Sequence, residues 1–296
     1  MTTTAQIIDG NKMAEEIRAE LRTEIEALAK QGVVPGLAVV LVGDNPASQV
    51  YVRMKQKACT DIGLASFEYR LDKSTPEDAL LALIAQLNAD PKVDGILVQL
   101  PLPKQIDEKK VLNAVDPSKD VDGFHPINVG KMLNGDETFL PCTPLGCQVM
   151  LVRSGHSPDG KHVVIVGRSN IVGKPLAAML MQKAPGANAT VTVCHSRTKN
   201  LPAIVAQGDI VIAAMGVPEF IKADMVKEGA VVIDVGVNRI EDATKKSGYR
   251  LVGDVDFAGV SQKAKAISPV PGGVGPMTIT MLLKNTIRAA KMRRTM

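Results

Sequence analysis

Short apolar runs alternate along this chain with segments whose apolar residues recur at helical spacing. The runs predict strands at 37–42, 95–100, 162–166, 190–194, 210–214 and 231–235, and the alternating apolar and polar residues of 66–71 predict a further strand. Helices are expected at 11–31, 46–62, 77–88, 173–183 and 277–291, the third opened by Ser74 and Glu77 at capping-box spacing. Repeated strand–helix alternation with apolar strands is typical of parallel sheets covered on both faces. We therefore predict an α/β fold.

The length divides this fold into two parts. At roughly 150 residues per domain, 296 residues predict two domains. A stretch rich in turn-forming residues separates the two sets of strands, at 116–144. We place the domain boundary inside it. The interior must be mainly aliphatic, because aromatic residues make up only 3% and tryptophan is absent.

Composition excludes several functional classes. The net charge of +4 is small and spread along the chain, which argues against a nucleic-acid partner. No apolar run approaches 18 residues, and the first residues lack a secretory pattern, so we expect no membrane span and a cytoplasmic protein. The four cysteines form no CxxC pair and no zinc spacing with histidine, so we expect reduced, buried thiols and no metal.

The strand at 162–166 leads into the turn Gly167–Gly173 (GRSNIVG) and then a helix. A strand, a turn of small residues and a helix N-terminus can cradle a phosphate. The Walker A spacing is not met, and Ser169 occupies the second glycine position of the GxGxxG pattern. A dinucleotide site is therefore indicated by context alone, and an ordinary tight turn remains open.

The next strand bears on the choice of cofactor. NAD sites usually carry an acidic residue about 20 residues after the glycine turn. Here the strand at 190–194 is followed by His195, Ser196, Arg197 and Thr198, with no acid. Together with Arg168, these groups suit a 2′-phosphate and favour NADP. A solvated basic loop is the alternative interpretation.

The first half carries a candidate acid–base pair. Tyr51 and Lys55 lie four residues apart on one face of the helix expected at 46–62, with Ser48 one turn earlier. Such pairs are often merely solvated. Short-chain dehydrogenases also use YxxxK, but there it follows the nucleotide turn, whereas here it precedes Gly167 by more than a hundred residues.

Three further segments stand out. Gln99 ends the strand at 95–100, where ligands of open α/β sheets bind, although a loop tie would explain it equally. Asp120 and Asp122 lie in a turn, where capping is the simpler explanation for either. The segment 271–278 (PGGVGPMT) fixes unusual backbone without side-chain bulk, which suits close approach of a ligand.

Together these segments resemble one family, the bifunctional methylenetetrahydrofolate dehydrogenase/methenyltetrahydrofolate cyclohydrolases of the FolD type. The matching segments run in the family's order across nearly the whole chain: SQVYVRMK (48–55), GILVQLPLP (95–103), KDVDGFHP (119–126), PCTPLG (141–146), GRSNIVGKP (167–175) and PGGVGPMTI (271–279). The resemblance implies oxidation of 5,10-methylenetetrahydrofolate by NADP⁺, then hydrolysis of the methenyl product to 10-formyltetrahydrofolate. It also implies two α/β domains facing a cleft, 1–140 joined by the C-terminal helix 277–296, and a Rossmann-like NADP-binding domain at 141–276.

The resemblance also assigns roles to residues. Lys55 would transfer the proton of the hydrolysis step, and Gln99 would position it. Tyr51 would stack on the folate ring and Asp122 would accept hydrogen bonds from it. Further folate contacts are implied for Ser48, Pro271, Gly272 and Gly273. NADP contacts are implied for Gly167, Arg168, Ser169, Ser196 and Val237.

Two other functions remain open from the residues alone. One is an NADP-dependent dehydrogenase of another small substrate, with Lys55 as the base. The other is a dinucleotide-sensing or scaffold protein without activity. The presence of Lys55, Gln99 and Asp122 argues against this second alternative. The resemblance further suggests a homodimer. The segment 241–248 looks like a lengthened loop remote from the chemistry.

Overall fold

The computed structural model describes residues 5–245 and 248–294, which divide into two compact units. The first, here called the lysine unit, comprises Glu15–Cys142 and the helical residues from Ile279 onward. The second, here called the glycine-turn unit, comprises Thr143–Thr278 and the residues before Glu15. Each unit has its own parallel sheet, which confirms the predicted α/β class.

The lysine unit is built on a three-stranded parallel sheet in the order β3-β2-β4. Its strands are β2 (Gly36–Val42), β3 (Ala65–Leu71) and β4 (Gly95–Val98). Its helices are α2 (Pro46–Ile62), α3 (Glu77–Ala89), α4 (Glu108–Ala114) and α5 (Pro126–Asn134), with most of α1 (Gly10–Ala29) and α10 (Val274–Arg294).

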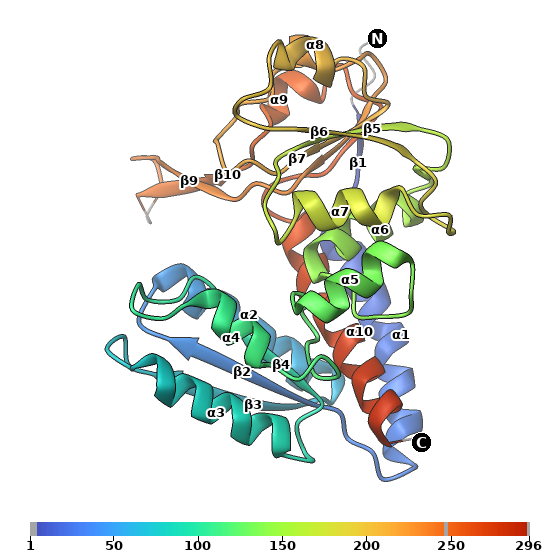
Figure 1. The fold of residues 1–296 in the computed structure, drawn as a ribbon. Coiled ribbons are helices and arrows are strands. Elements are labelled where there is room, and N and C mark those ends of the chain that lie inside the picture. Colours follow the sequence, from blue (N-terminus) through green and yellow to red (C-terminus); the bar gives the residue numbers. More distant parts are fainter. Residues whose placement is uncertain (1–4, 246–247, 295–296) are drawn as a thin grey trace. The chain divides into compact units, whose positions relative to one another are not determined.

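Every residue of β2 is buried, because helices cover both faces of this sheet. On one face, Ala38 and Val40 belong to a core shared with Leu80 and Ile84 of α3 and Val111 of α4. Figure 1 shows α3 and α4 beside these strands. The continuous apolar runs of the sequence therefore report burial on two sides.

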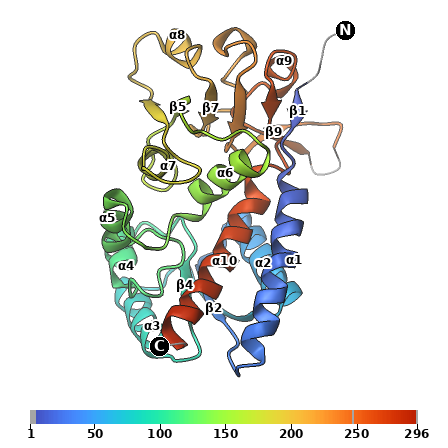
Figure 2. The ribbon, with the colours of Figure 1, turned by 90° about the vertical axis from the view of Figure 1, so that its right-hand side faces the viewer.

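The last helix is fixed to the lysine unit by polar contacts. Figures 1 and 2 show α1 and α10 side by side, and the Arg18 guanidinium donates to the Thr280 hydroxyl at 2.9 Å. Asp94, which is fully buried, binds Arg293 at 3.1 Å and Arg294 at 2.7 Å. A hydrogen bond to α1 and a buried carboxylate that binds two arginines thus hold α10.

The glycine-turn unit contains a six-stranded parallel sheet in the order β1-β11-β8-β7-β5-β6. The strands are β1 (Gln6–Ile7), β5 (His162–Val166), β6 (Thr190–Cys194), β7 (Ile210–Ala213), β8 (Val231–Asp234) and β11 (Ala266–Ile267). Short helices connect them: α6 (Cys142–Arg153), α7 (Gly173–Leu180), α8 (Leu201–Val205), α9 (Phe257–Val260) and a 3-10 turn at Ala223–Met225.

A two-stranded antiparallel hairpin, β9 (Asn238–Glu241) with β10 (Tyr249–Val252), projects from this unit. It lies where the sequence predicts a lengthened loop over 241–248, of which 246–247 fall outside the described residues.

The structure corrects two local predictions. The stretch expected to be loop contains α5, whose first N–H groups are capped by His125: its ring Nδ1 accepts from Ile127 N at 3.1 Å. The capping box at Ser74 does not form, because its hydroxyl donates to Asp72 and α3 begins after Pro76 without a side-chain cap. The division into units also differs from the expected one in placing the residues before Glu15 with the second sheet.

All four cysteines, Cys59, Cys142, Cys147 and Cys194, are buried and unpaired, as expected for reduced thiols. Among the helices of the described ranges, none has the length and hydropathy that a membrane span requires.

Candidate active site and nucleotide-binding edge

Helix α2 carries three of the predicted site residues on one face. Asn45 caps the helix, its side chain accepting from Ala47 N at 3.0 Å and Ser48 N at 3.1 Å. Ser48 and Lys55 are only 4% and 7% exposed. Tyr51 lies between them and is partly buried. The prediction that these side chains share a face is confirmed, and the alternative of a solvated lysine is wrong.

The Lys55 amine is held by Gln99, which follows β4. Lys55 Nζ donates to Gln99 Oε1 at 2.9 Å, while Gln99 Nε2 donates to the Leu100 carbonyl at 2.9 Å. The carbonyl bond fixes the amide's orientation, since only its NH₂ end can donate. The backbone N–H of Gln99 continues the ladder to the Val40 carbonyl at 2.8 Å. The sheet therefore fixes Gln99, and Gln99 in turn fixes the Lys55 amine.

Burial changes the acid–base chemistry of this cluster. It lowers the pKa of Lys55, against the opposing attraction of the Asp122 carboxylate. Burial raises the pKa of Tyr51, so its phenol stays neutral. A lysine with a lowered pKa holds more free amine near neutral pH, which is the form that can accept a proton.

The two aspartates of the turn have different roles. Asp120 accepts hydrogen bonds from Phe124 N at 3.2 Å, His125 N at 2.8 Å and Asn128 Nδ2 at 2.8 Å, so it is a structural residue of the turn. Burial raises the pKa of Asp120 to about 6. Burial also raises the pKa of Asp122, and the neighbouring Lys55 opposes the rise. Asp122 is therefore the carboxylate that belongs to the lysine cluster.

Cys142 completes the cluster, and sequence reasoning treated it only as a packed thiol. Its Sγ lies 3.4 Å from the Val121 carbonyl and 3.7 Å from Asn285 Nδ2. Burial and the Asp122 charge raise the pKa of Cys142 well above its usual value, so it stays a thiol. Cys142 is distant from Asp122 in sequence and bears no motif that connects them, so only the fold reveals the contact.

The predicted phosphate turn is tight. A Cβ on Gly167 would lie 2.0 Å from the Ala214 carbonyl oxygen, and one on Gly173 would lie 2.0 Å from the Gly167 oxygen. Ser169 Oγ accepts from Val172 N at 3.1 Å, and the side chains of Arg168 and Ser169 are exposed. Both glycines are thus required by the chain's own packing, which brings β5, β7 and α7 together.

The end of β6 lies next to this turn, since β5 and β6 pair in parallel register up to Val166 and Cys194. Ser196 and Arg197 are exposed beyond it, while His195 Nδ1 accepts from Arg197 N at 3.1 Å. The sequence places no acidic residue between 190 and 200. A hydroxyl and a guanidinium are therefore presented at this strand end without a competing carboxylate.

The remaining predicted residues also lie in the glycine-turn unit. Val237 follows β8 and its side chain is 49% exposed. Gly272 has a φ of +101°, and its carbonyl accepts from Asn11 N at 3.1 Å. A Cβ on Gly10 would lie 1.8 Å from the Gly273 oxygen. The close approach predicted for a ligand at this glycine segment is thus made, at least in part, by the start of α1.

The predicted residues therefore form two groups. The lysine unit brings together Ser48, Tyr51, Lys55, Gln99 and Asp122. The glycine-turn unit carries Gly167, Arg168, Ser169, Ser196 and Val237 at the carboxyl edge of its sheet, and also the segment Pro271–Gly273.

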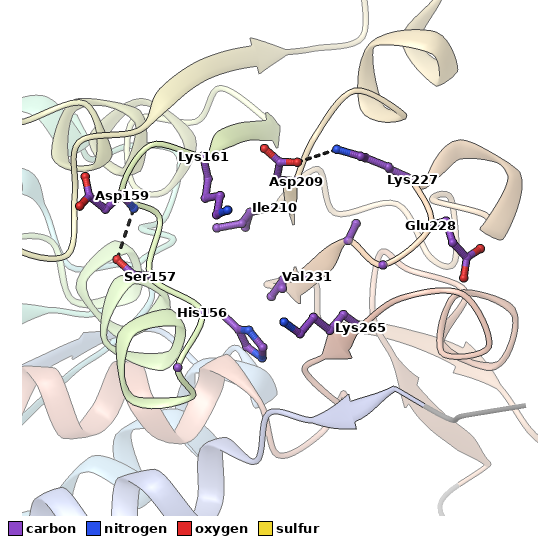
Figure 3. Close-up of a pocket in the computed structure, with 13 residues that line it drawn as sticks. His156, Ser157, Asp159, Lys161, Asp209, Ile210, Lys227, Glu228, Val231 and Lys265 are labelled. Atoms are coloured by element: carbon purple, nitrogen blue, oxygen red, sulfur yellow. Dashed lines mark hydrogen bonds and ion pairs between the residues drawn. The ribbon is translucent and has the colours of Figure 1, made fainter.

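A pocket of about 610 Å³ lies at the opposite, amino edge of the second sheet (Figure 3). Its charged side chains include Lys227 and Asp209, which form an ion pair at 2.6 Å. It is lined near the starts of β5, β7 and β8, whereas ligands of parallel α/β sheets bind at the carboxyl ends. We therefore do not assign the chemistry to this pocket.

Comparison with known families connects the two groups of residues. "Tetrahydrofolate dehydrogenase/cyclohydrolase, catalytic domain" matches residues 8–122, and the NAD(P)-binding domain of the same family matches residues 141–294. The chain belongs to the tetrahydrofolate dehydrogenase/cyclohydrolase family. This confirms the resemblance and the bifunctional enzyme activity, gives the NAD(P)-binding domain that the expected NADP cofactor requires, and gives no support to a dehydrogenase of another substrate.

Individual relatives agree over almost the full length. The bifunctional protein FolD of Dehalococcoides mccartyi is 61% identical over 97% of both chains. A crystal structure of the bifunctional FolD enzyme from Campylobacter jejuni is 50% identical, with a TM-score of 0.92 over 98% of this chain and 99% of that one. The Trypanosoma brucei FolD structure, complexed with NADP and an inhibitor, is 40% identical, with a TM-score of 0.93 over 98% and 99%.

Proposed function

We propose that this family member oxidises 5,10-methylenetetrahydrofolate with NADP⁺ and hydrolyses the resulting methenyl cation to 10-formyltetrahydrofolate, using Lys55 as the proton-transfer group. The main support for the proposal is the buried Lys55 amine, whose Nζ donates to Gln99 Oε1 at 2.9 Å. The Asp122 carboxylate attracts the charged form of this amine. A buried amine in an apolar fold needs such partners, and here they are the residues that the family resemblance assigns to folate chemistry.

The residues at the carboxyl edge of the second sheet fit NADP. The tight turn at Gly167 leaves Arg168 and Ser169 exposed beside the N-terminus of α7, where backbone dipoles favour a phosphate. Ser196, and the guanidinium groups of Arg168 and Arg197, supply a hydroxyl and positive charge where an NAD enzyme usually has a carboxylate. When bound, the nicotinamide supplies a hydride acceptor.

In the lysine unit, the side chains bind the folate and control its protons. Asp122 accepts two hydrogen bonds from the pterin amino group and a ring nitrogen, a charge-assisted pairing. Tyr51, neutral because burial raises its pKa, stacks on the ring system. Ser48 adds a polar contact from the same helix face.

The hydrolysis step uses the free amine of Lys55. Water adds to the methenyl carbon while Lys55 Nζ accepts its proton, forming a new C–O bond. The adduct's hydroxyl oxygen then forms the formyl C=O bond while the carbon–nitrogen bond to N5 breaks. The ammonium returns its proton to N5, the hydroxyl proton is released to solvent, and the formyl group remains on N10. The positive charge of the methenyl substrate lowers the pKa of Lys55 further, so binding of this substrate favours the base form.

The assay of this function follows the two products in one cuvette. Mixing the protein with 5,10-methylenetetrahydrofolate and NADP⁺ should produce NADPH and transient absorbance of the methenyl product, which then decays faster than in buffer. Failure to form NADPH with this substrate would refute the proposal. A methenyl product that accumulates and decays only at the spontaneous rate would refute the hydrolase half.

We also propose that the enzyme acts in the cytoplasm and as a homodimer. The reduced, buried thiols support the first statement, and the family resemblance supports the second. Light scattering of the purified protein tests the dimer: a mass near 31.4 kDa, that of one chain, would exclude it.

A further inference from the structure

Two buried carboxylates lie at the carboxyl edge of the six-stranded sheet, outside the group of residues assigned above. Asp234 ends β8 and is 3% exposed; Asp254 follows β10 and is fully buried. Within 5–245 and 248–294, their hydrogen-bond partners are N–H groups. A buried charge needs such partners, so this pair organises the backbone around it.

Asp254 holds the loops that follow two neighbouring strands. Its Oδ2 accepts from Met215 N at 2.7 Å and from Gly216 N at 2.8 Å, in the loop after β7. Its Oδ1 accepts from the Asn238 side-chain amide at 2.9 Å, one residue after Val237 in the segment that follows β8. One carboxylate therefore ties both loops together.

Asp234 holds Asp254 in place. Its Oδ1 accepts from Asp254 N at 2.9 Å and from Gly236 N at 3.0 Å, and its Oδ2 accepts from Val255 N at 2.9 Å. Burial raises the pKa of Asp234 to about 7, and the Asp254 charge adds to the rise. The two acids thus act as one connected unit.

Two glycines leave the space that the two carboxylates occupy. A Cβ on Gly236 would lie 2.2 Å from Asp254 Oδ1, and a Cβ on Gly253 would lie 1.8 Å from Asp234 Oδ2. The only side chain small enough for these positions is a hydrogen atom. The arrangement therefore depends on four residues together: Asp234, Gly236, Gly253 and Asp254.

The loops that Asp254 ties lie at the switch point of the sheet. Strand β5 is flanked by β6 on one side and β7 on the other, and β8 follows β7. Ligands bind at such a point, beyond the carboxyl ends of the strands. The loops after β7 and β8 expose the side chains of Val217 (43%) and Val237 (49%), an apolar surface suited to the nicotinamide ring.

We propose that Asp254 is a positioning residue for the dinucleotide, fixing the loops after β7 and β8 as the surface on which the nicotinamide half of NADP rests. The proposal rests on the proposed function, because it assumes that NADP binds at this edge. It assigns Asp254 to the dehydrogenase step alone, since hydrolysis of the methenyl compound requires no nicotinamide.

The test compares both activities in Asp254→Ala and Asp254→Asn, with hydrolysis measured on methenyltetrahydrofolate supplied directly. Removing charged hydrogen bonds should raise the KM for NADP⁺ by about tenfold or more in Asp254→Ala. Asp254→Asn, which keeps one acceptor oxygen, should restore part of the affinity. Hydrolysis should remain within about twofold of the wild type. Asp224→Ala, a change at an exposed aspartate of the same unit, is the matched control and should change neither activity.

Two outcomes would overturn the proposal: an unchanged KM for NADP⁺ in Asp254→Ala, or equal losses of both activities. Should that variant fail to fold, Asn238→Ala removes only the side-chain donor to Asp254, and it must still raise the KM for NADP⁺ while sparing hydrolysis. A wild-type protein that lacks dehydrogenase activity would instead refute the proposed function itself, so the two failures are distinguishable.

Discussion

Replacing Gln99 should move the pH dependence of hydrolysis in a direction set by the new side chain. Gln99 Oε1 accepts from Lys55 Nζ at 2.9 Å and so stabilises the ammonium. A hydrogen bond to a charged group contributes about 1.5–3 kcal/mol, and 1.36 kcal/mol corresponds to one pH unit. Because Gln99 is partly exposed, we take the lower end of this energy range. In Gln99→Leu the acid limb of the rate profile should therefore move down by about one pH unit.

Gln99→Glu reverses the sign, because a carboxylate beside Lys55 stabilises the ammonium more than the amide does. Its acid limb should move to higher pH, with a slower rate at neutral pH. The assay is decay of methenyltetrahydrofolate absorbance at several pH values, after subtraction of the spontaneous rate. The midpoint of the pH profile measures the pKa of the Lys55 amine, whereas the plateau rate also depends on how well Lys55 is positioned.

A matched control is Gln86→Leu, a change at an exposed glutamine of α3, which should leave the profile in place. If the two Gln99 variants shift the midpoint in the same direction, or not at all, Lys55 is not the base whose deprotonation limits hydrolysis.

Three other changes test separate parts of the structure. Arg168→Ala should weaken NADP binding far more than NAD binding in parallel titrations, and equal losses would mean that this guanidinium does not contact the 2′-phosphate. Asp94→Ala leaves two arginines of α10 without their buried partner and should lower the free energy of unfolding in urea by about 3–5 kcal/mol, whereas a change below 1 kcal/mol would contradict the role given to this ion pair. Gly253→Ala places a Cβ 1.8 Å from Asp234 Oδ2 and should lower the free energy of unfolding by about 1–3 kcal/mol. Gly130→Ala, where a Cβ would meet nothing within 4 Å, should not lower the free energy of unfolding.

Local signals in the sequence were sufficient where local chemistry decides the structure. Helix α2 has the predicted bounds because Asn45 caps its start and Gly63, with a φ of +89°, ends it. Strands β5 and β6 also have the predicted bounds, since each is a short segment rich in β-branched residues between turn residues. The Lys55 and Gln99 pairing, in contrast, was implied by the family resemblance, because the two residues lie 44 positions apart and share no local pattern.

The errors occur where the decisive contacts are distant in sequence or use an unusual cap. Helix α5 was missed because its cap is the ring nitrogen of His125, a residue type outside the usual capping set. Ser74 was assigned to a cap, but Asp72, two residues away, takes its hydroxyl. Strand β1 forms only by pairing with β11, some 260 residues later, and no local pattern announces it.

The candidate site shows the same division. Residue type and spacing pointed to Lys55 and to two aspartates of one turn, of which only the family resemblance singled out Asp122. The separate roles of Asp120 and Asp122 depend on which N–H groups and charges each carboxylate reaches. Cys142 joins them only through the packing of α6. Asp254 gave no signal in the sequence, because its partners come from two other loops.

The most direct test of the central claim is the hydrolysis of methenyltetrahydrofolate by Lys55→Met, a change that keeps the length and apolar stem of the side chain and removes the amine. We expect hydrolysis to fall to the spontaneous rate, while NADP binding, measured by titration of the same preparation, stays as in the wild type. Full hydrolytic turnover by this variant would contradict the assignment of Lys55 as the proton-transfer group.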